Sequence, residues 1–285
     1  MRTSSLFVAR HLSAARALLV FTLLLGFGYP LAMVGVAQLP GLSAKADGSL
    51  TQNGNQVVGS RLIGQSFTDA DGAPMPAYFQ SRPSAAGAGY DPTATSASNL
   101  GPEDVVDTPD RPSLLTQVCA RSRAVGELED VDGSRPYCTQ DGVGAVLGVY
   151  YTDGLTGEVV RAVSLNQTSG TPFIDEYRGV PVGLAEPGVD YSTAVVVPIR
   201  GDAPSAPDVP ADAVTASASG LDPDISPAYA RLQAARVARE RGVEVSEVQS
   251  LIDEYTHGRA LGLFGQAGVN VLELNLALDE RYPQP

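Results

Sequence analysis

ALLVFTLLLGFGYPLAMVGVA, residues 17–37, contains no charged side chain. A helix of about 20 apolar residues crosses the hydrocarbon core of a bilayer, and it pairs its own backbone N–H and C=O groups there. Pro30 removes one of those hydrogen bonds and is expected to bend the helix. The run predicts one transmembrane helix over residues 17–38, preceded by a short N-terminal segment, residues 1–16.

Glycines and a proline distinguish this run from a uniform apolar span. Glycine leaves a shallow place on a helix surface, where a second helix can approach closely. Two interpretations are open, a plain anchor or a helix that docks against other membrane helices. The candidate docking positions are Gly26, Gly28, Pro30 and Gly35.

The charges before the run predict its orientation. Arg2, Arg10 and Arg16 precede it, and no Asp or Glu occurs before Asp47. Positive residues stay on the cytoplasmic side of a membrane helix, so residues 1–16 are expected in the cytoplasm and the main domain outside. The expected location is therefore the cell membrane, with a single pass.

A cleaved signal peptide is the alternative for this N-terminal run. Gly35 and Ala37 form a small-residue pair of the kind that a signal peptidase accepts. The apolar core of a signal peptide is usually about 7–15 residues long, and this run is longer. A retained transmembrane helix is therefore favoured.

The composition restricts what the chain binds and how it is stabilised. The formal net charge is −13, which disfavours nucleic acid and anionic lipid surfaces as partners. The cysteines, Cys119 and Cys138, both lie in the predicted extracytoplasmic part. An even count in an oxidising compartment predicts one disulfide, with two unpaired thiols as the alternative.

Hydrophobic patterning predicts an α+β outer domain with a β-rich insert. The domain is expected over residues 39–129 and 208–285, and the insert over residues 130–207. A strand or hairpin is expected over residues 56–67, and a helix over residues 113–128. Within the insert, strands are expected over residues 143–151, 158–165 and 193–199, with an Asp153-Gly154 hairpin turn and Pro198 marking an edge strand.

The last part of the chain carries the clearest local signals. Ser226-Pro227 predicts the start of a helix that ends at Gly242. Ser246 and Gln249 match a capping box for a second helix. Leucines at alternate positions over residues 272–278 predict a final strand with one apolar face.

Residues for catalysis or metal binding are scarce. Lys45 is the only lysine, so a phosphate-binding loop of the GxxxxGK[ST] type is absent. The histidines are His11 and His257, and together with two bonded cysteines they do not provide an ordinary zinc site. His257 is expected to interact with the last carbonyls of a helix. No catalytic residue and no metal ligand is predicted.

A loop and the helix after it are the most distinctive stretches. Residues 214–227 read VTASASGLDPDISP, in which small residues permit close backbone approach to a ligand or partner. The plainer interpretation is a turn in which Asp side chains bond nearby amides. The following helix carries Arg231, Arg236, Arg239 and Arg241, either for a phosphate or acidic partner or as a solvated face.

Taken together, these stretches resemble the C subunit of the bacterial Kdp-type potassium-transporting ATPase, the KdpC family. Six separate motifs occur in the family's order. The matching stretches are YPL (29–31), VGS (58–60), IGQSF (63–67), RPSA (82–85), SNLGP (98–102), and a closing block of residues 214–227, RVA (236–238), GR (258–259), VNVL (269–272) and LNLALD (274–279). The usual family member lacks the segment over residues 130–207, so the predicted disulfide is not a family feature.

The resemblance implies a non-catalytic accessory subunit of an ATP-driven potassium importer. Its implied partners are potassium-translocating, ATP-hydrolysing and small subunits, and potassium is the transported ion. No tightly bound cofactor is implied, and ATP enters through the complex. The family is described as a catalytic chaperone for ATP binding, and Gln233 with Arg236 is the implied nucleotide contact. Ser219, Gly220, Asp222 and Asp224 belong to the family's motif loop.

The predicted topology conflicts with that nucleotide contact. ATP is cytoplasmic, whereas the charge pattern places Gln233 on the other side of a membrane roughly 30 Å thick. The outer domain is therefore expected to cover the entrance of the potassium-translocating subunit. A stand-alone membrane-anchored enzyme or binding module that uses the β-rich insert is the alternative function.

Overall fold

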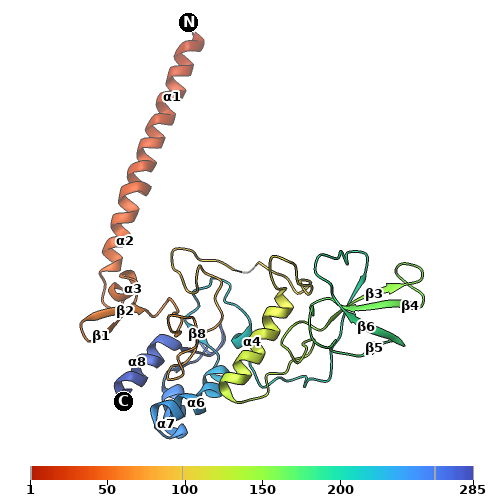
Figure 1. Cartoon of the computed structure of the whole chain (residues 1–285). Helices are drawn as coiled ribbons and strands as arrows, with labels where there is room; N and C mark the ends of the chain where they lie inside the picture. The colour runs from red at the N-terminus through yellow and green to blue at the C-terminus, as the bar shows by residue number, and fades with distance from the viewer. Residues whose placement is uncertain (1, 98, 260, 285) are drawn as a thin grey trace. The chain divides into compact units, whose positions relative to one another are not determined.

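The computed structural model describes residues 2–97, 99–259 and 261–284, with side chains from residue 6 onward (Figure 1). Met1 and Ser98, which fall in the predicted N-terminal segment and the 98–102 motif, lie outside the described residues. The chain forms two compact units, Met1–Ser60 and Arg61–Pro285. Each unit is considered by itself below.

The first unit is dominated by one long helix (Figure 1). It comprises α1 (Arg2–Phe21), a π-helical segment η1 (Thr22–Gly28) and α2 (Tyr29–Ala37). Within it, Leu6–Ala37 is long and apolar enough to cross a membrane, and it is the one such helix among the described residues. The prediction of a membrane-capable helix is thus confirmed, and the membrane-capable stretch includes residues 17–37.

The π-helical segment stands directly before Pro30. Tyr29 N–H donates to the carbonyl of Leu24, five residues back instead of four. A proline ring collides with the carbonyl four residues before it, here that of Gly26, and a wider turn relieves this clash. The side chains of residues 6–36 are exposed, and a Cβ added at Gly35 would meet no atom within 4 Å.

The rest of the first unit is a short helix and a hairpin. α3 (Ser43–Ala46) precedes the antiparallel strands β1 (Leu50–Asn53) and β2 (Gln56–Ser60). Ser60 Oγ donates to Gly48 O at 2.6 Å, which fastens the hairpin to the end of α3. The strand predicted over residues 56–67 is therefore confirmed as far as Ser60.

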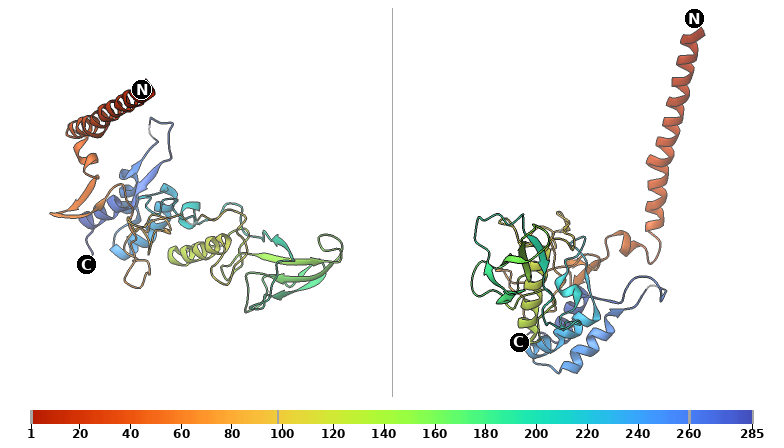
Figure 2. Two further views of the ribbon diagram at one scale, coloured as in Figure 1. Left: turned by 90° about the horizontal axis from the view of Figure 1, so that it is seen from above. Right: turned by 90° about the vertical axis from the view of Figure 1, so that its right-hand side faces the viewer.

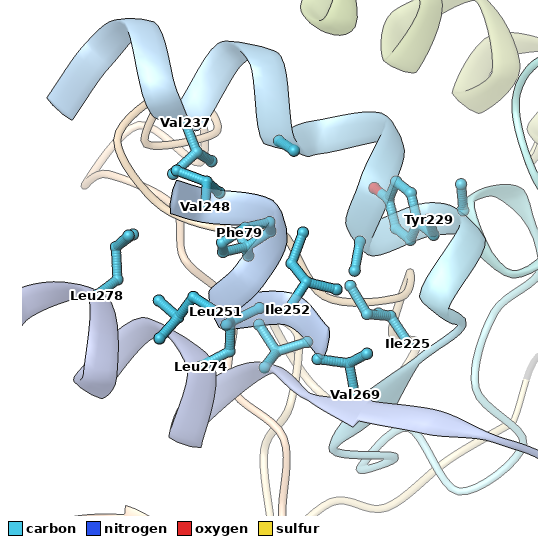
Figure 3. Close-up of a cluster of buried hydrophobic side chains, with 14 of the residues drawn as sticks. Phe79, Ile225, Tyr229, Val237, Val248, Leu251, Ile252, Val269, Leu274 and Leu278 are labelled. Atoms are coloured by element: carbon cyan, nitrogen blue, oxygen red, sulfur yellow. The ribbon is translucent and has the colours of Figure 1, made fainter. Parts of the chain in front are cut away.

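The main core of the second unit packs three helices around a small sheet (Figure 3). The helices are α6 (Pro227–Arg241), α7 (Val245–Glu254) and α8 (Val271–Arg281). The sheet is antiparallel, in the order β8 (Asp224–Ile225), β10 (Gly268–Asn270), β9 (Thr256–His257). Phe79 comes from a distant loop and is fully buried among them. A short helix α5 (Ala211–Val214) precedes β8.

Local capping signals set the ends of α6 and α7. Ser226 Oγ accepts a hydrogen bond from Tyr229 N–H, and Gly242 ends α6 with a φ of +67°, as predicted. α7 begins two residues earlier than expected, because its capping box is formed by Glu244 and Glu247. The Ser246–Gln249 prediction was therefore wrong in register.

The strand predicted over residues 272–278 was wrong, because these residues form helix α8. Asn270 caps the helix by accepting from Glu273 N–H at 3.1 Å. Its Leu, Glu and Ala residues are strong helix formers. Val271, Leu274, Asn275 and Leu278 are buried at helical spacing, so the alternating leucines lie on a helix that is buried around much of its circumference.

The predicted insert contains a five-stranded sheet with its own small core. The order is β5 (Glu176–Tyr177), β6 (Val180–Leu184), β4 (Val159–Ser164), β3 (Val146–Tyr151), β7 (Val195–Pro198). β3 and β4 are the predicted hairpin, and β7 is an edge strand, as Pro198 indicated. Leu147, Val149, Ala162 and Val182 form the core. The overall class, α+β with one membrane-capable helix, is confirmed.

A disulfide and a buried amide fasten the insert to helix α4 (Leu114–Glu129) and its approach. Cys119 on α4 is bonded to Cys138, with the two Cα atoms 5.4 Å apart, as predicted. Asn166 Nδ2 donates to Val105 O and Gly144 O at 2.8 and 3.1 Å. Asn166 belongs to an Asn-x-Thr sequence, but its side chain is engaged inside the protein.

Candidate functional site

Three stretches that carry the resemblance meet in the second unit. Gly64 N–H donates to Leu221 O at 2.9 Å, which joins the IGQSF stretch to the motif loop. Ser217 N–H donates to Pro83 O at 2.9 Å, and Ser84 Oγ donates to Gly220 O at 2.7 Å. Residues more than a hundred positions apart therefore form one site.

An ion pair lies where these stretches meet. Arg82 Nη1 donates to Asp222 Oδ2 at 2.7 Å, and the two side chains are 23% and 33% exposed. Tyr90 Oη donates to the carbonyl of Arg82 at 2.9 Å and approaches that of Asp222 at 3.3 Å. Burial raises the pKa of Tyr90 to about 12, so its hydroxyl remains a donor at physiological pH. Arg82, Asp222 and Tyr90 are named the Arg82 cluster.

Two glycines make this convergence possible. A Cβ at Gly64 would collide with the Tyr90 ring and lie 2.6 Å from Asp222 O. Gly220 has a φ of +72°, and its Cβ would lie 2.5 Å from Ala86 Cβ. A side chain at either position would push the motif loop away from its neighbours, which explains the small residues that the sequence places there.

Two clefts lie on either side of the Arg82 cluster, and Arg82 with Asp222 lines both. The polar cleft, about 370 Å³, is bordered by Asp212, Asp224 and His257. The apolar cleft, about 750 Å³, is bordered by Leu62, Ile63 and Leu221 and by the small residues of the motif loop. A ligand or partner segment in either cleft would contact the ion pair.

The polar groups of the polar cleft are largely bonded to one another. His257 Nε2 lies 3.0 Å from Asp224 Oδ2, so the prediction that His257 interacts with helix carbonyls was wrong. Asp224 N–H donates to Asp222 Oδ1 at 3.2 Å, which is the Asp turn considered for this loop. Asp212 accepts from Ser226 N–H and Oγ–H. Among the described residues, no three His, Cys, Asp or Glu side chains are grouped to hold a metal ion.

The implied nucleotide residue Gln233 lies in the core rather than in either cleft. Its Oε1 accepts from Gln80 N–H at 2.6 Å, and its Nε2 donates to Gln80 O at 3.1 Å. Asn275 on α8 makes the same pair of bonds to Phe79, at 2.9 and 3.0 Å. Two side-chain amides, one from α6 and one from α8, thus pair with the backbone N–H and C=O groups of Gln80 and Phe79.

Arg236 completes this network. Its side chain is 2% exposed and pairs with the buried Glu129 at 3.0 Å, and it also donates to Pro76 O and Tyr78 O. Burial raises the pKa of Glu129, and the Arg236 guanidinium opposes that shift. Arg241 is likewise buried and donates to Ala77 O at 2.9 Å. The interpretation of a uniformly solvated arginine face was therefore wrong for Arg236 and Arg241.

The residues that organise the site were only partly accessible from sequence. Asp222 and Gly220 were singled out in the motif loop, whereas Arg82 was noted as part of a motif without a partner. Its partner lies 140 residues away, and no local spacing reports such a pair. Asn275 and Gln80 were not recognised, because a buried amide and a surface amide look alike in a sequence.

Comparison with known proteins shows the family of this chain. The family profile described as KdpC, "K+-transporting ATPase, c chain", matches residues 11–133 and 189–280 and leaves the sheet of the insert largely outside. The relatives below align over 93–95% of this chain and 88–91% of their own length, so the expectation that family members lack residues 130–207 was wrong for them. Relatives named potassium-transporting ATPase KdpC subunit are 38% identical in Beijerinckia indica subsp. indica (94% of this chain, 91% of the relative) and 38% in Kineococcus radiotolerans (93% and 91%). One from Myxococcus xanthus is 37% identical (95% and 88%). The chain therefore belongs to the KdpC family, the C chains of potassium-transporting ATPases.

Proposed function

We propose that this chain is a non-catalytic accessory subunit of an ATP-driven potassium importer. The observation that carries the proposal is the convergence of the family's motif stretches on the Arg82 cluster. If these stretches form one interaction site with a partner, they must lie together in the folded chain, and they do so at the Arg82 cluster. The expected partners are the potassium-translocating, ATP-hydrolysing and small subunits of the pump, and the curated relatives carry the name of such a subunit.

The proposed arrangement has a single membrane pass, with the second unit on the extracytoplasmic side. Arg2, Arg10 and Arg16 support it through the positive-inside rule. The Cys119–Cys138 disulfide fits this arrangement, because disulfides persist in oxidising compartments and are rare in the cytosol. In this arrangement the acidic second unit stands at the outer mouth of the potassium pathway and favours cations there.

The contribution to ATP binding is proposed to be indirect. Gln233 and Arg236 were the implied nucleotide contacts, and both are engaged in holding residues 76–80. A nucleotide would have to displace these buried bonds, which are costly to leave unmade. Their proposed role is to fix the shape of the domain that docks on the pump, so any effect on ATP affinity passes through the complex.

The test is co-purification of the full chain with the pump's other subunits in mild detergent. The substitution Arg82→Ala should reduce recovery of the partners, because it unpairs Asp222 between the two clefts. Arg123→Ala is the matched control, because it removes an exposed ion pair with Glu127 on α4. Recovery of equal amounts with both variants would argue against the Arg82 cluster as the docking site. Turnover of a small substrate by the purified chain alone would instead support the stand-alone module.

A further inference from the structure

The loop between β9 and β10 exposes an apolar tip. Leu261, Leu263 and Phe264 are 89%, 78% and 65% exposed, so three large apolar side chains within four consecutive positions are in solvent. Figure 2 shows this loop projecting from the rest of the second unit in both views. Isolated exposed leucines are common on proteins, whereas a contiguous group on a projecting loop indicates a binding surface.

The charge around this tip differs from that of the chain. Residues 255–272 contain no Asp or Glu, although the chain as a whole has a formal net charge of −13. Arg259 stands at the beginning of the loop. The mouth of a cation pathway is electronegative, and an acidic domain meets repulsion there. The loop is a part of the domain that can approach such a mouth without like-charge repulsion.

The backbone of the loop argues for a protein partner over lipid. Its described residues are not helical: residues 261–263 form a turn, Gly262 N–H donates to Arg259 O at 3.0 Å, and Phe264 takes part in a β-bridge. Irregular, non-helical backbone is excluded from lipid-exposed positions in hydrocarbon, because lipid offers its polar groups no partner. A protein socket supplies both apolar contacts and hydrogen bonds, as in the addition of an extended segment to a partner.

The membrane-capable helix limits which partner the tip meets. A chain held in the membrane presents its tip at high effective concentration to other membrane-embedded chains beside it. We infer that the apolar tip inserts into an apolar socket, rimmed by carboxylates, on the outer face of the pump's potassium-translocating subunit. This inference rests on the proposed function and names a further docking surface of the domain, separate from the Arg82 cluster.

The experiment is co-purification of the full-length chain with the pump's other subunits. The tip variant is Leu261→Ser, Leu263→Ser and Phe264→Ser together, and the control is Leu155→Ser with Val160→Ser. The control residues are 77% and 57% exposed in the β3–β4 region. The tip variant should lower partner recovery about tenfold or more, as expected for buried anchor residues, while the control leaves it unchanged.

Further variants separate docking from misfolding. Because the tip side chains lie outside the core, the serine variant should unfold at the same temperature as the unmodified chain. The apolar variant Leu261→Met, Leu263→Met and Phe264→Leu should retain the complex. Arg259→Glu should weaken recovery at low salt and less so at high salt, because salt screens the repulsion from a carboxylate rim.

A photo-reactive phenylalanine analogue in place of Phe264 identifies the occupant directly. Cross-linking to the potassium-translocating subunit is the expected result. Cross-linking to lipid or to a second copy of this chain would overturn the inference, as would undiminished partner recovery with the serine variant. If the unmodified chain recovers no pump subunit, the proposed function itself is wrong. If the unmodified chain recovers them and the serine variant recovers equal amounts, only the role of the apolar tip is wrong.

Discussion

At the residue scale, two buried side-chain amides hold a loop segment in place through hydrogen bonds to its backbone. Gln233 on α6 pairs with the backbone N–H and C=O of Gln80, and Asn275 on α8 pairs with those of Phe79 in the same way. Removing one such side chain leaves a buried N–H and C=O without partners, and an unsatisfied buried group costs about 1–3 kcal/mol. The shape of segment 76–80 therefore depends on two side chains from different helices.

Gln233→Ala should lower the free energy of unfolding by about 2–4 kcal/mol, since it leaves two backbone groups unpaired and opens a small cavity. Urea denaturation of the full chain in detergent measures the change. Gln249→Ala on the exposed side of α7 is the matched control and should have little effect. If Gln233→Ala preserved stability yet abolished the effect on ATP affinity of the pump, direct nucleotide contact would be supported instead.

Tyr90 predicts how stability changes in alkali. Burial raises its pKa to about 12 in the folded protein, against about 10 in the unfolded chain. The folded state therefore keeps the phenol proton longer, and the resulting stability is complete below pH 10. It is lost as the pH rises toward 12, by roughly 2–3 kcal/mol in total.

Tyr90→Phe should flatten this alkaline decline, because the substituted ring has no proton to lose. Unfolding free energies measured in urea at several values between about pH 9 and pH 11 provide the comparison. Tyr229, whose pKa burial also raises, remains in both proteins. An identical decline in the two proteins would show that Tyr90 ionises freely in the folded state.

At the element scale, the disulfide joins helix α4 to the first residues of the insert. Cys119 and Cys138 are separated by 19 positions. Closing a loop of this size stabilises a protein by about 3 kcal/mol, mainly by restricting the unfolded chain. The stabilisation acts on the junction between the insert and the rest of the second unit.

Replacing both cysteines by serine should lower the free energy of unfolding by about 2–4 kcal/mol. Reduction of the unmodified protein with dithiothreitol should produce a similar loss, whereas it should not affect the serine variant. Thermal unfolding followed by circular dichroism measures both. Equal stability before and after reduction would mean that the bond does not form in the native compartment.

The helices and strands also show which features could be predicted from neighbouring residues alone. The caps at Ser226 and Gly242 and the β3–β4 hairpin were predicted because each depends on a few neighbouring residues. α8 was not, because alternating leucines satisfy a strand pattern as well as a helix buried on several faces. Packing of these residues against α7 and Phe79 determines that they form a helix rather than a strand. The local sequence contains no information about that packing.

At the scale of the whole molecule, the membrane-capable helix is proposed to dock as well as anchor. Its glycines and the π-helical segment before Pro30 interrupt an otherwise bulky apolar surface. Close helix packing in lipid needs such small residues, because the hydrophobic effect does not drive association there. A helix that only anchors would need none of them.

Gly26→Leu, Gly28→Leu and Gly35→Leu together should leave the chain in the membrane fraction but reduce recovery of the other pump subunits. The control is Leu18→Ile with Leu19→Ile and Leu23→Ile, which keeps the bulk of the helix. Membrane fractionation and co-purification in mild detergent provide the two readouts. If the triple-leucine variant recovers as much of the complex as the unmodified chain, the helix serves only as a membrane anchor.

The sequence by itself determined the features that depend on neighbouring residues: the apolar helix, the caps of α6, the β3–β4 hairpin and the pairing of the only two cysteines. The tertiary structure decided the rest. It buried Arg236 and Arg241, made α8 a helix, and brought Arg82 to Asp222 across 140 residues. The physical reason is that burial and long-range pairing depend on which surfaces meet in the folded chain, and local propensity contains no information about that meeting.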